Sequence, residues 1–412
     1  MINIEGQKEC CFVDVYEESV AKHRELGGKL SVSSKMPIQN RHDLSLAYTP
    51  GVARVCEEIA ADIEKVYELT IKKSSVAVVS DGSAVLGLGN IGPEAAIPVM
   101  EGKAVLFKEY ANIDAFPICL ATQNTQEIID TIRRIAPVFG GINLEDISAP
   151  RCFEIENALQ DLGIPVFHDD QHGTAIVVLA AVLNAAKVSG KPISEMTVVI
   201  NGGGAAGTAI AELLLCLGQD AQFPHALKDI LVCDSKGILS ISRPDLATAP
   251  DKLRLAQKTN RNNRQGLLFD AMRGADVFLG VSVANAVSPD MIRVMNTYPI
   301  VLAMANPIPE IMPDVAKDAG ALIVGTGRSD FPNQVNNVLA FPGIFRGALD
   351  ARAKVITQSM KIAAAMALAH YLPEPKVDEI LPSVLDKKVT LAVAAAVKAA
   401  WLAENVPSAQ RS

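Results

Sequence analysis

The 412-residue sequence predicts an α/β protein in which parallel sheets are covered by helices. Short β-branched runs that end at Gly, Asp or Pro alternate with segments of helical length, the pattern of strand–helix–strand units. Aromatic residues are scarce (12 Phe, 6 Tyr and 1 Trp), so the cores are built from aliphatic side chains, as is typical of parallel sheets. The length allows two or three domains, each with its own core.

The first part of the chain predicts a smaller α/β domain over residues 1–172. Residues 43–69 carry apolar side chains at helical spacing on both sides of a turn at 49–51, so two short helices are expected there. Strands are expected at 76–80, 104–107, 117–120 and 165–168, with a helix over 125–136.

The second part of the chain repeats this alternation. A helix that begins at Thr174 leads to a strand at 197–200, a glycine-rich turn and a helix over 208–217. Further strands are expected at 230–233, 277–280, 300–304 and 322–324, and the Ala-rich sequence after residue 346 predicts helices. We therefore expect a second domain over 173–345 and a C-terminal helical extension over 346–412 that packs back on the first domain.

A glycine motif indicates what the second domain binds. Gly202, Gly204 and Gly207 directly follow a strand and open a helix. In a Rossmann-type unit the first glycine allows a tight turn, the second lets the backbone approach a pyrophosphate, and the third allows close helix–sheet packing. Ala205 and Ala206 lie at the helix N-terminus, whose free N–H groups attract phosphate. The sequence therefore predicts a doubly wound parallel sheet that binds a dinucleotide.

Two further features bear on the cofactor. Asp234 ends the next strand, 27 residues beyond the last glycine, and would accept hydrogen bonds from the adenosine ribose. Its charge would repel the 2′-phosphate of NADP, but Arg243 and Lys252 could neutralise that phosphate, so NAD and NADP both stay open. A second glycine run, with Gly87 and Gly89, predicts either a flexible loop or a loop that touches substrate or nicotinamide.

Two acidic pairs follow apolar strand-like segments of the first domain, Glu145-Asp146 and Asp169-Asp170. One such pair is more often a helix cap or a solvated turn, but two pairs beside a cofactor-binding fold are consistent with a site for a hard cation, Mg²⁺ or Mn²⁺. The nearby segment HDDQH does not predict a zinc hydrolase. Its two histidines would need to share one helix, and the helix is expected to begin only at Thr174.

Composition excludes other classes of function. The formal net charge of −8 argues against a protein that binds nucleic acid through its phosphates. The apolar stretch 175–186 is too short to span a bilayer and Lys398 interrupts 389–403, so no membrane association is expected. The N-terminal residues do not have the pattern of a signal peptide. Seven cysteines without a C-x-x-C pair are typical of free thiols in a reducing compartment, so a cytoplasmic location is expected.

The order and wording of these motifs resemble the malic enzymes in their short bacterial form. The resemblance runs from about residue 48 to residue 348 and is carried by YTPGVA (48–53), SDGSAVLGLGNIG (80–92), MEGKAVLFK (100–108), NLEDI (143–147), HDDQHGTA (168–175), GGGAAG (202–207), ANPIPE (305–310) and NQVNNVLAFPG (333–343). Malic enzymes oxidise L-malate with NAD or NADP, decarboxylate the oxaloacetate formed and release pyruvate. The resemblance implies this activity for the chain.

The resemblance also implies roles for individual residues. Tyr48 matches the general acid and Lys103 the general base. The ligands of the divalent metal match Glu145, Asp146 and Asp170. The residues that support this site or contact substrate and cofactor match Asp169, Asn306 and Asn337. Where larger relatives carry an arginine for the substrate carboxylate, this chain has Ala84, so carboxylate recognition must come from elsewhere.

Two other functions stay open at this point. A cofactor-independent oxaloacetate decarboxylase on the same scaffold would keep the metal and Tyr48 but would not need the glycine motif, so the intact motif disfavours it. A non-catalytic nucleotide sensor would be expected to lack Tyr48, Lys103 or a metal ligand, and all are present. The expected partners are small molecules (L-malate, oxaloacetate and pyruvate). The resemblance also implies a homodimer, for which the first 40 residues are a candidate contact.

Overall fold

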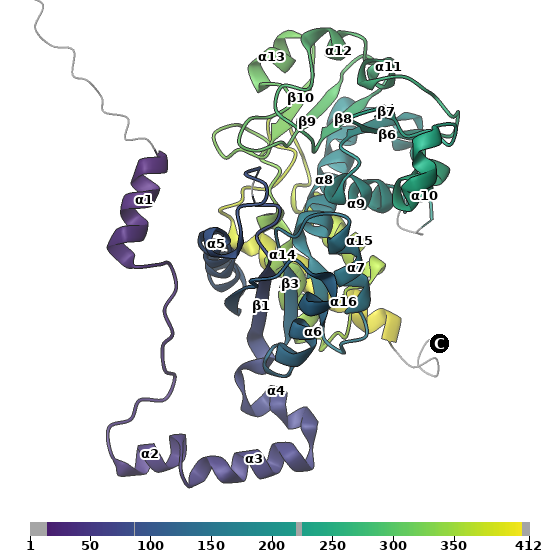
Figure 1. The fold of residues 1–412 in the computed structure, drawn as a ribbon. Helices are drawn as coiled ribbons and strands as arrows, with labels where there is room; N and C mark the ends of the chain where they lie inside the picture. The colour runs from purple at the N-terminus through teal and green to yellow at the C-terminus, as the bar shows by residue number, and fades with distance from the viewer. Residues whose placement is uncertain (1–14, 86, 220–224, 406–412) are drawn as a thin grey trace, which may run out of the picture.

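The computed structural model describes residues 15–85, 87–219 and 225–405 (Figure 1). Its main body contains two sheets, and an N-terminal arm extends from this body. This agrees with the α/β class and with the parallel sheets that the sequence predicts. The two sheets lie on either side of a cleft, and the fold brings their strand ends together there.

The first sheet has four parallel strands in the order β2-β1-β3-β4. The strands are β1 (Ser75–Ser80), β2 (Asp114–Cys119), β3 (Gly141–Leu144) and β4 (Val166–His168). Strand β1 is buried along its whole length because its alternate side chains pack toward α5 (Pro93–Ala111) on one face and α6 (Thr125–Ile135) on the other. The strand expected at 104–107 is wrong: these residues belong to α5, where Ala104 and Phe107 form part of the buried helix face.

The second sheet has six strands in the order β10-β9-β8-β5-β6-β7, parallel except for β7. The strands are β5 (Thr197–Asn201), β6 (Asp229–Asp234), β7 (Gly237–Ile238), β8 (Val277–Gly280), β9 (Ile300–Ala303) and β10 (Ile323–Thr326). Strand order reverses between β5 and β8, which is where doubly wound sheets bind ligands, at the carboxyl ends of the strands. The Rossmann-type prediction is confirmed.

One long helix, α8 (Asp169–Ser189), connects the two sheets and is buried along most of its length. It begins at Asp169 rather than at Thr174, so the expected helix start is wrong and His172 lies in the helix, not in a preceding loop. By length and composition α8 is the one described helix able to cross a membrane, but 72% of its most apolar window is buried inside the protein. Its apolar character is therefore accounted for by the core.

The C-terminal helices α14 (Phe341–Asp350), α15 (Gln358–Tyr371) and α16 (Lys387–Asn405) pack on one another. Helix α15 also packs on α8, while α14 and α16 contact α5 of the first sheet. The remaining helices are α4 (Val66–Leu69), α7 (Arg151–Ala158), α9 (Ala205–Leu214), α10 (Pro250–Lys258), α11 (Leu268–Met272), α12 (Pro289–Arg293) and α13 (Pro313–Asp318). The domain boundaries at residues 172 and 345 stay predictions.

The N-terminal arm consists of α1 (Val15–Leu26), α2 (Arg41–Ala47), α3 (Gly51–Ala61) and the segments between them. The turn between α2 and α3 is the one that the sequence predicts. None of these three helices contains a buried residue, and Figure 1 shows α2 and α3 extending away from the main body. The arm therefore leaves its apolar side chains uncovered within one chain.

Candidate active site

A cleft of about 960 Å³ lies between the two sheets. The first sheet contributes the residues that follow β3 and β4, and the second contributes Ser282 and Asn306, which follow β8 and β9. Carboxyl ends of parallel strands thus meet at the cleft from both sides. Lys103, from the buried face of α5, completes the wall between them.

Three carboxylates converge in this cleft. Glu145 and Asp146 directly follow β3, and Asp170 lies in the first turn of α8. One oxygen of each lies within 4.8 Å of the others. Asp146 adopts a left-handed backbone conformation (φ 54°), and its N–H donates a 2.7 Å hydrogen bond to Asp170 Oδ2. The set offers several oxygen ligands at one point, the donor chemistry that Mg²⁺ and Mn²⁺ prefer.

Lys103 is held against two carboxylates. Its Nζ lies 2.6 Å from Asp169 Oδ2 and 2.9 Å from Glu145 Oε1, and all three side chains are buried. Burial by itself would lower the pKa of Lys103, but the negative charges of Asp169 and Glu145 outweigh it and raise that pKa. The same burial raises the pKa of Glu145 and of Asp169, each to about 7, against the opposing effect of Lys103. The lysine is therefore held in its protonated form against two carboxylates whose own pKa values burial raises.

Asp169 supports Lys103 and does not line the cleft. It is fully buried, and its Oδ2 also accepts a 2.5 Å hydrogen bond from Asn337 Nδ2. A Cβ at Gly173, one turn further along α8, would lie 1.9 Å from Asp169 Oδ1, so only glycine allows this carboxylate its position. Asp169 was expected among the substrate contacts, and the structure places it behind Lys103 instead. Asn337 does line the cleft.

The glycine loop predicted at Gly87 and Gly89 borders the cleft. Gly87 lines it, with a φ of 75°, and a Cβ there would lie 2.4 Å from the carbonyl oxygen of Asn306. This close approach brings the loop of the first sheet against the loop of the second. Of the two interpretations left open for this glycine run, the loop at the active site is the one that the structure favours.

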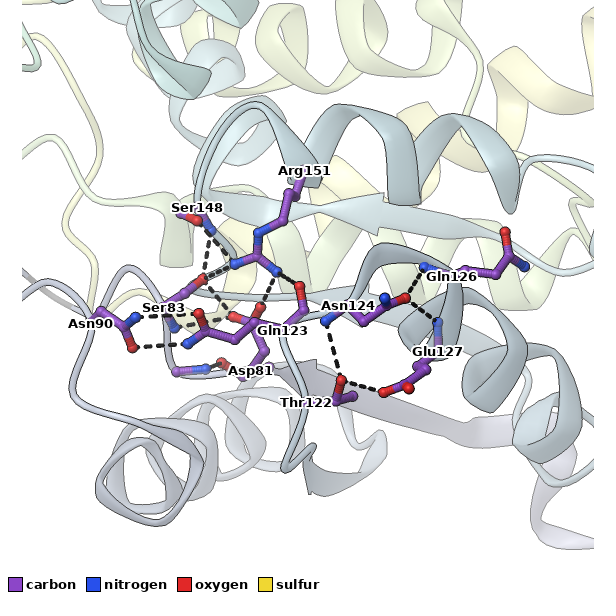
Figure 2. Close-up of polar contacts among 12 residues, drawn as sticks. Asp81, Ser83, Asn90, Thr122, Gln123, Asn124, Gln126, Glu127, Ser148 and Arg151 are labelled. Atoms are coloured by element: carbon purple, nitrogen blue, oxygen red, sulfur yellow. Dashed lines mark hydrogen bonds and ion pairs between the residues drawn. The ribbon is translucent and has the colours of Figure 1, made fainter.

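A half-buried ion pair that sequence reasoning missed holds the segment leading into the glycine loop (Figure 2). Arg151, in the first turn of α7, donates from Nη1 to Asp81 Oδ2 (2.6 Å) and from Nη2 to Ser83 Oγ (2.9 Å) and Ser148 Oγ (3.0 Å). Asp81 is fully buried. The next residue of the loop, Ala84, donates its N–H to the carbonyl oxygen of Asp146, which links this network to the three carboxylates. The Asp81-Gly82 turn that follows β1 is the one local signal for it.

A second cavity, of about 820 Å³, lies over the carboxyl ends of β5 and β6 and is lined by Gly202, Gly204 and Asp234. Gly202 has a φ of 132°, and a Cβ at Gly207 would lie 1.7 Å from the carbonyl oxygen of Gly202, so the predicted reasons for both glycines hold. Ala205 and Ala206, at the start of α9, line the first cleft instead. The glycine turn therefore separates a nucleotide cavity from the reaction cleft, and a dinucleotide spanning it would reach both.

Asp234 is already paired. Its Oδ1 accepts a 2.8 Å hydrogen bond from Arg243 Nη1, and its Oδ2 accepts one of 2.7 Å from Lys252 Nζ. Burial alone would raise the pKa of Asp234, but hydrogen bonds from these two cations lower it to about 2. The carboxylate is thus ionised but neutralised, and it no longer simply repels a 2′-phosphate. Residues 220–224, in the long connection between the glycine motif and Asp234, lie outside the described residues.

Tyr48 is the predicted site residue that the structure does not bring to the others. It caps the C-terminus of α2, and its side chain is 69% exposed on the arm. Figure 1 shows α2 far from α5, which carries Lys103. A single chain therefore assembles the lysine, the carboxylates and the asparagines, but not the tyrosine.

A dinucleotide-binding sheet that faces a buried lysine and a group of carboxylates defines a nicotinamide-dependent oxidoreductase. Comparison with known proteins is more specific. Residues 27–160 match the family model of the malic enzyme N-terminal domain, and residues 171–401 match that of the malic enzyme NAD-binding domain. The chain belongs to the malic enzyme family.

Individual relatives agree with this assignment. The chain is 54% identical to the bifunctional malic/malolactic enzyme of Bacillus subtilis, over 95% of the chain and 94% of that protein. It is 53% identical to the NAD-dependent malic enzyme of Geobacillus stearothermophilus (93% and 78% covered) and 46% identical to the NADP-dependent malic enzyme of Halomonas elongata (86% and 82% covered). The crystal structure of the NAD-dependent malic enzyme of Thermotoga maritima superimposes with a TM-score of 0.88 at 50% identity, over 92% of this chain and 98% of that one.

Proposed function

We propose that this chain oxidises L-malate and decarboxylates the product to pyruvate and CO₂, with reduction of NAD or NADP and with Mg²⁺ or Mn²⁺ as the metal. The observation that carries the proposal is the contact of Lys103 with Glu145 and Asp169 (2.9 and 2.6 Å), beside the three carboxylates and against the dinucleotide-binding sheet. No arrangement of this kind is needed by a protein that only binds a nucleotide.

Glu145, Asp146 and Asp170 are the residues that would hold the metal. When bound there, a divalent cation would lower the pKa of the substrate hydroxyl and stabilise the negative charge that decarboxylation leaves. The residues fit this group because their oxygens already converge within 4.8 Å, and among the described residues Lys103 is the cation that acts on Glu145 and Asp170.

Lys103 is proposed as the base that takes the hydroxyl proton of malate. It must first be neutral, and Asp169, whose Oδ2 lies 2.6 Å from Lys103 Nζ, is positioned to accept its proton. Asn337 holds Asp169 in place from the other side. Hydride then leaves carbon 2 of malate for the nicotinamide, whose ring would lie in the cleft between Ala206 and Asn306.

We further propose that the active form is a homodimer in which Tyr48 comes from the second copy. The arm exposes large apolar side chains, among them Ile38, Leu44 and Leu46, and α2 and α3 contain no buried residue. Such a surface is covered in solution by a partner, and a closed two-fold dimer exchanges identical arms. Tyr48 would then supply the proton that carbon 3 of the enolate requires.

Mixing two inactive variants tests the exchange. Tyr48→Phe and Lys103→Ala chains, refolded or co-expressed together, form heterodimers with one complete site if Tyr48 crosses to the partner. About a quarter of all sites would then be intact, and activity should return to about a quarter of wild type. Heterodimers without activity would place Tyr48 in the site of its own chain.

Initial rates test the proposed reaction. With L-malate and Mn²⁺, the protein should reduce NAD or NADP, and rates with the two cofactors side by side determine which it prefers. A protein that consumed oxaloacetate but reduced neither cofactor would instead be the cofactor-independent decarboxylase.

A cytoplasmic location is also proposed, and the five described cysteines support it because all are free thiols, as expected in a reducing compartment.

A further inference from the structure

A second lysine lines the reaction cleft. Lys29 follows α1 in the arm, and it lies in the cleft wall together with Lys103. Among the described residues that line the cleft, these two are the only lysines and none is an arginine. Lys103 is already paired with Asp169 and Glu145 (2.6 and 2.9 Å). Lys29 is therefore the lysine that remains for an anionic substrate.

Local backbone geometry brings Lys29 against α5. Gly28 has a φ of 110°, and a Cβ there would lie 3.0 Å from Glu101 Oε1, so glycine lets the arm pass close to this helix. Glu101 Oε2 accepts a 3.0 Å hydrogen bond from the backbone N–H of Lys29. The ammonium of Lys29 donates a 2.6 Å hydrogen bond to the carbonyl oxygen of Pro98, and a Cβ at Gly102 would lie 3.5 Å from Nζ. Lys29 Nζ thus lies against the turn of α5 next to the proposed base.

The ammonium of Lys29 has binding capacity left. It can donate three hydrogen bonds, and the contact with Pro98 uses one of them. Glu101 bonds the backbone N–H instead, and the ammonium forms no ion pair with any residue that the structure describes. Burial lowers the pKa of Lys29 and the charge of Glu101 opposes this, so a bound anion would favour the charged form further.

The other ionisable groups of the cleft wall do not offer a positively charged donor. The carboxylates are the three of the proposed metal site, whose charge a divalent cation would compensate. Burial lowers the pKa of His168, which favours its neutral form. His23 Nδ1 lies 2.7 Å from the carbonyl oxygen of Ser19, so Nδ1 carries the proton. The buried Nε2 of His23 then accepts rather than donates while the ring is neutral.

The two carboxylates of L-malate differ in their fate. The one on carbon 3 leaves as CO₂, so its charge moves away in the transition state. A cation held against it would stabilise the bound substrate more than the transition state. The carboxylate on carbon 2 remains in pyruvate and keeps its charge throughout. A fixed ammonium in the cleft therefore matches the carboxylate on carbon 2.

We infer that Lys29 binds the carboxylate on carbon 2 of L-malate, an inference that rests on the proposed function. Lys29 then holds the carboxylate while Lys103 takes the proton of the adjacent hydroxyl. The arm would thus contribute to two sites. Lys29 completes the cleft of its own chain, and Tyr48 is proposed to reach the cleft of the second copy.

Binding of L-malate tests the inference without turnover. The protein is saturated with Mg²⁺ and NADH, which leaves no oxidised cofactor to accept a hydride, and calorimetric titration gives the Kd of L-malate. Lys29→Met and Lys29→Gln should each raise this Kd about tenfold or more, since a charged donor is lost. Lys29→Arg keeps the charge and should bind within about threefold of wild type. Lys108→Met removes an exposed lysine of α5 that pairs with Asp114 (2.8 Å), and it should leave the Kd unchanged.

Initial rates show which interaction is lost. A carboxylate that keeps its charge is bound equally in the substrate and in the transition state, so Lys29→Met should raise KM for L-malate about tenfold and change kcat less than about threefold. The Kd of NADH should stay unchanged, whereas general damage to the cleft would raise it too. Wild-type protein that binds L-malate but oxidises none of it would contradict the proposed function alone. Equal Kd values for L-malate in wild type, Lys29→Met and Lys29→Gln, or a kcat that falls with KM unchanged, would overturn the inference.

Discussion

Replacing Arg151 with Met should destabilise the protein strongly, because it leaves the fully buried carboxylate of Asp81 without its cation. Asp81 would keep only the hydrogen bonds from the N–H and hydroxyl of Ser83 (3.0 and 2.6 Å). Breaking a buried ion pair on one side costs about 3–5 kcal/mol, and since Arg151 itself is 22% exposed we expect the lower end, about 3 kcal/mol.

Urea denaturation followed by circular dichroism measures this loss. The double variant Asp81→Asn with Arg151→Met should recover about 1–2 kcal/mol relative to Arg151→Met, because no unpaired charge is then buried. Arg133→Met is the matched control: it removes an arginine whose partner Asp161 is 71% exposed, and it should cost less than about 1 kcal/mol. An Arg151→Met protein as stable as wild type, or a double variant less stable than the single one, would refute the reasoning.

Three other predictions concern Lys103, Glu145 and Glu310 at the cleft. Lys103→Ala should lower kcat for malate oxidation by about 10²–10⁴-fold without changing NADH affinity measured by fluorescence, and full activity would exclude Lys103 as the base. Burial raises the pKa of Glu145 to about 7, so this acid is mostly protonated at pH 6 and ionised at pH 8 in the metal-free protein. Mn²⁺ must displace that proton, so its Kd should be about tenfold higher at pH 6 than at pH 8 in calorimetric titrations, whereas a Kd independent of pH would contradict the assignment. Glu310→Ala removes a fully buried carboxylate that accepts hydrogen bonds from the N–H groups of Ser282 (2.8 Å) and Ala305 (3.1 Å) at the cleft. It should destabilise the protein by about 2–3 kcal/mol in urea denaturation and raise KM for the dinucleotide. Unchanged stability and unchanged KM would show that this contact does not hold the two loops.

Local sequence was sufficient for the strands and for the glycine motif. Strands β5 and β6 are short apolar runs. Gly202 follows β5 and Asp234 ends β6, and such a run has few other stable conformations when both faces are covered. The same reasoning misassigned residues 104–107, where a strand-like run lies inside α5. That helix is fixed by its start at Pro93 and by packing on the first sheet, which lies outside any short window of sequence.

The site was predictable where its residues follow strands and not where they come together across the chain. Glu145 and Asp146 could be placed at the end of β3, but the pair of Arg151 and Asp81 joins residues 70 positions apart and no local pattern shows it. The helix start was placed at Thr174 instead of Asp169 because Asp169 and Asp170 were interpreted as possible metal ligands after a strand. They are also favourable first-turn residues, whose charges interact well with the helix N-terminus.

The most direct test of the proposed function is the stoichiometry of one reaction mixture that contains the protein, L-malate, Mn²⁺ and the preferred dinucleotide. Oxidative decarboxylation predicts equal amounts of reduced cofactor, pyruvate and CO₂ in wild type, and all three formed at least about 10²-fold more slowly in Lys103→Ala. Accumulation of oxaloacetate with reduced cofactor but without CO₂, or release of CO₂ without reduced cofactor, would contradict the proposed function.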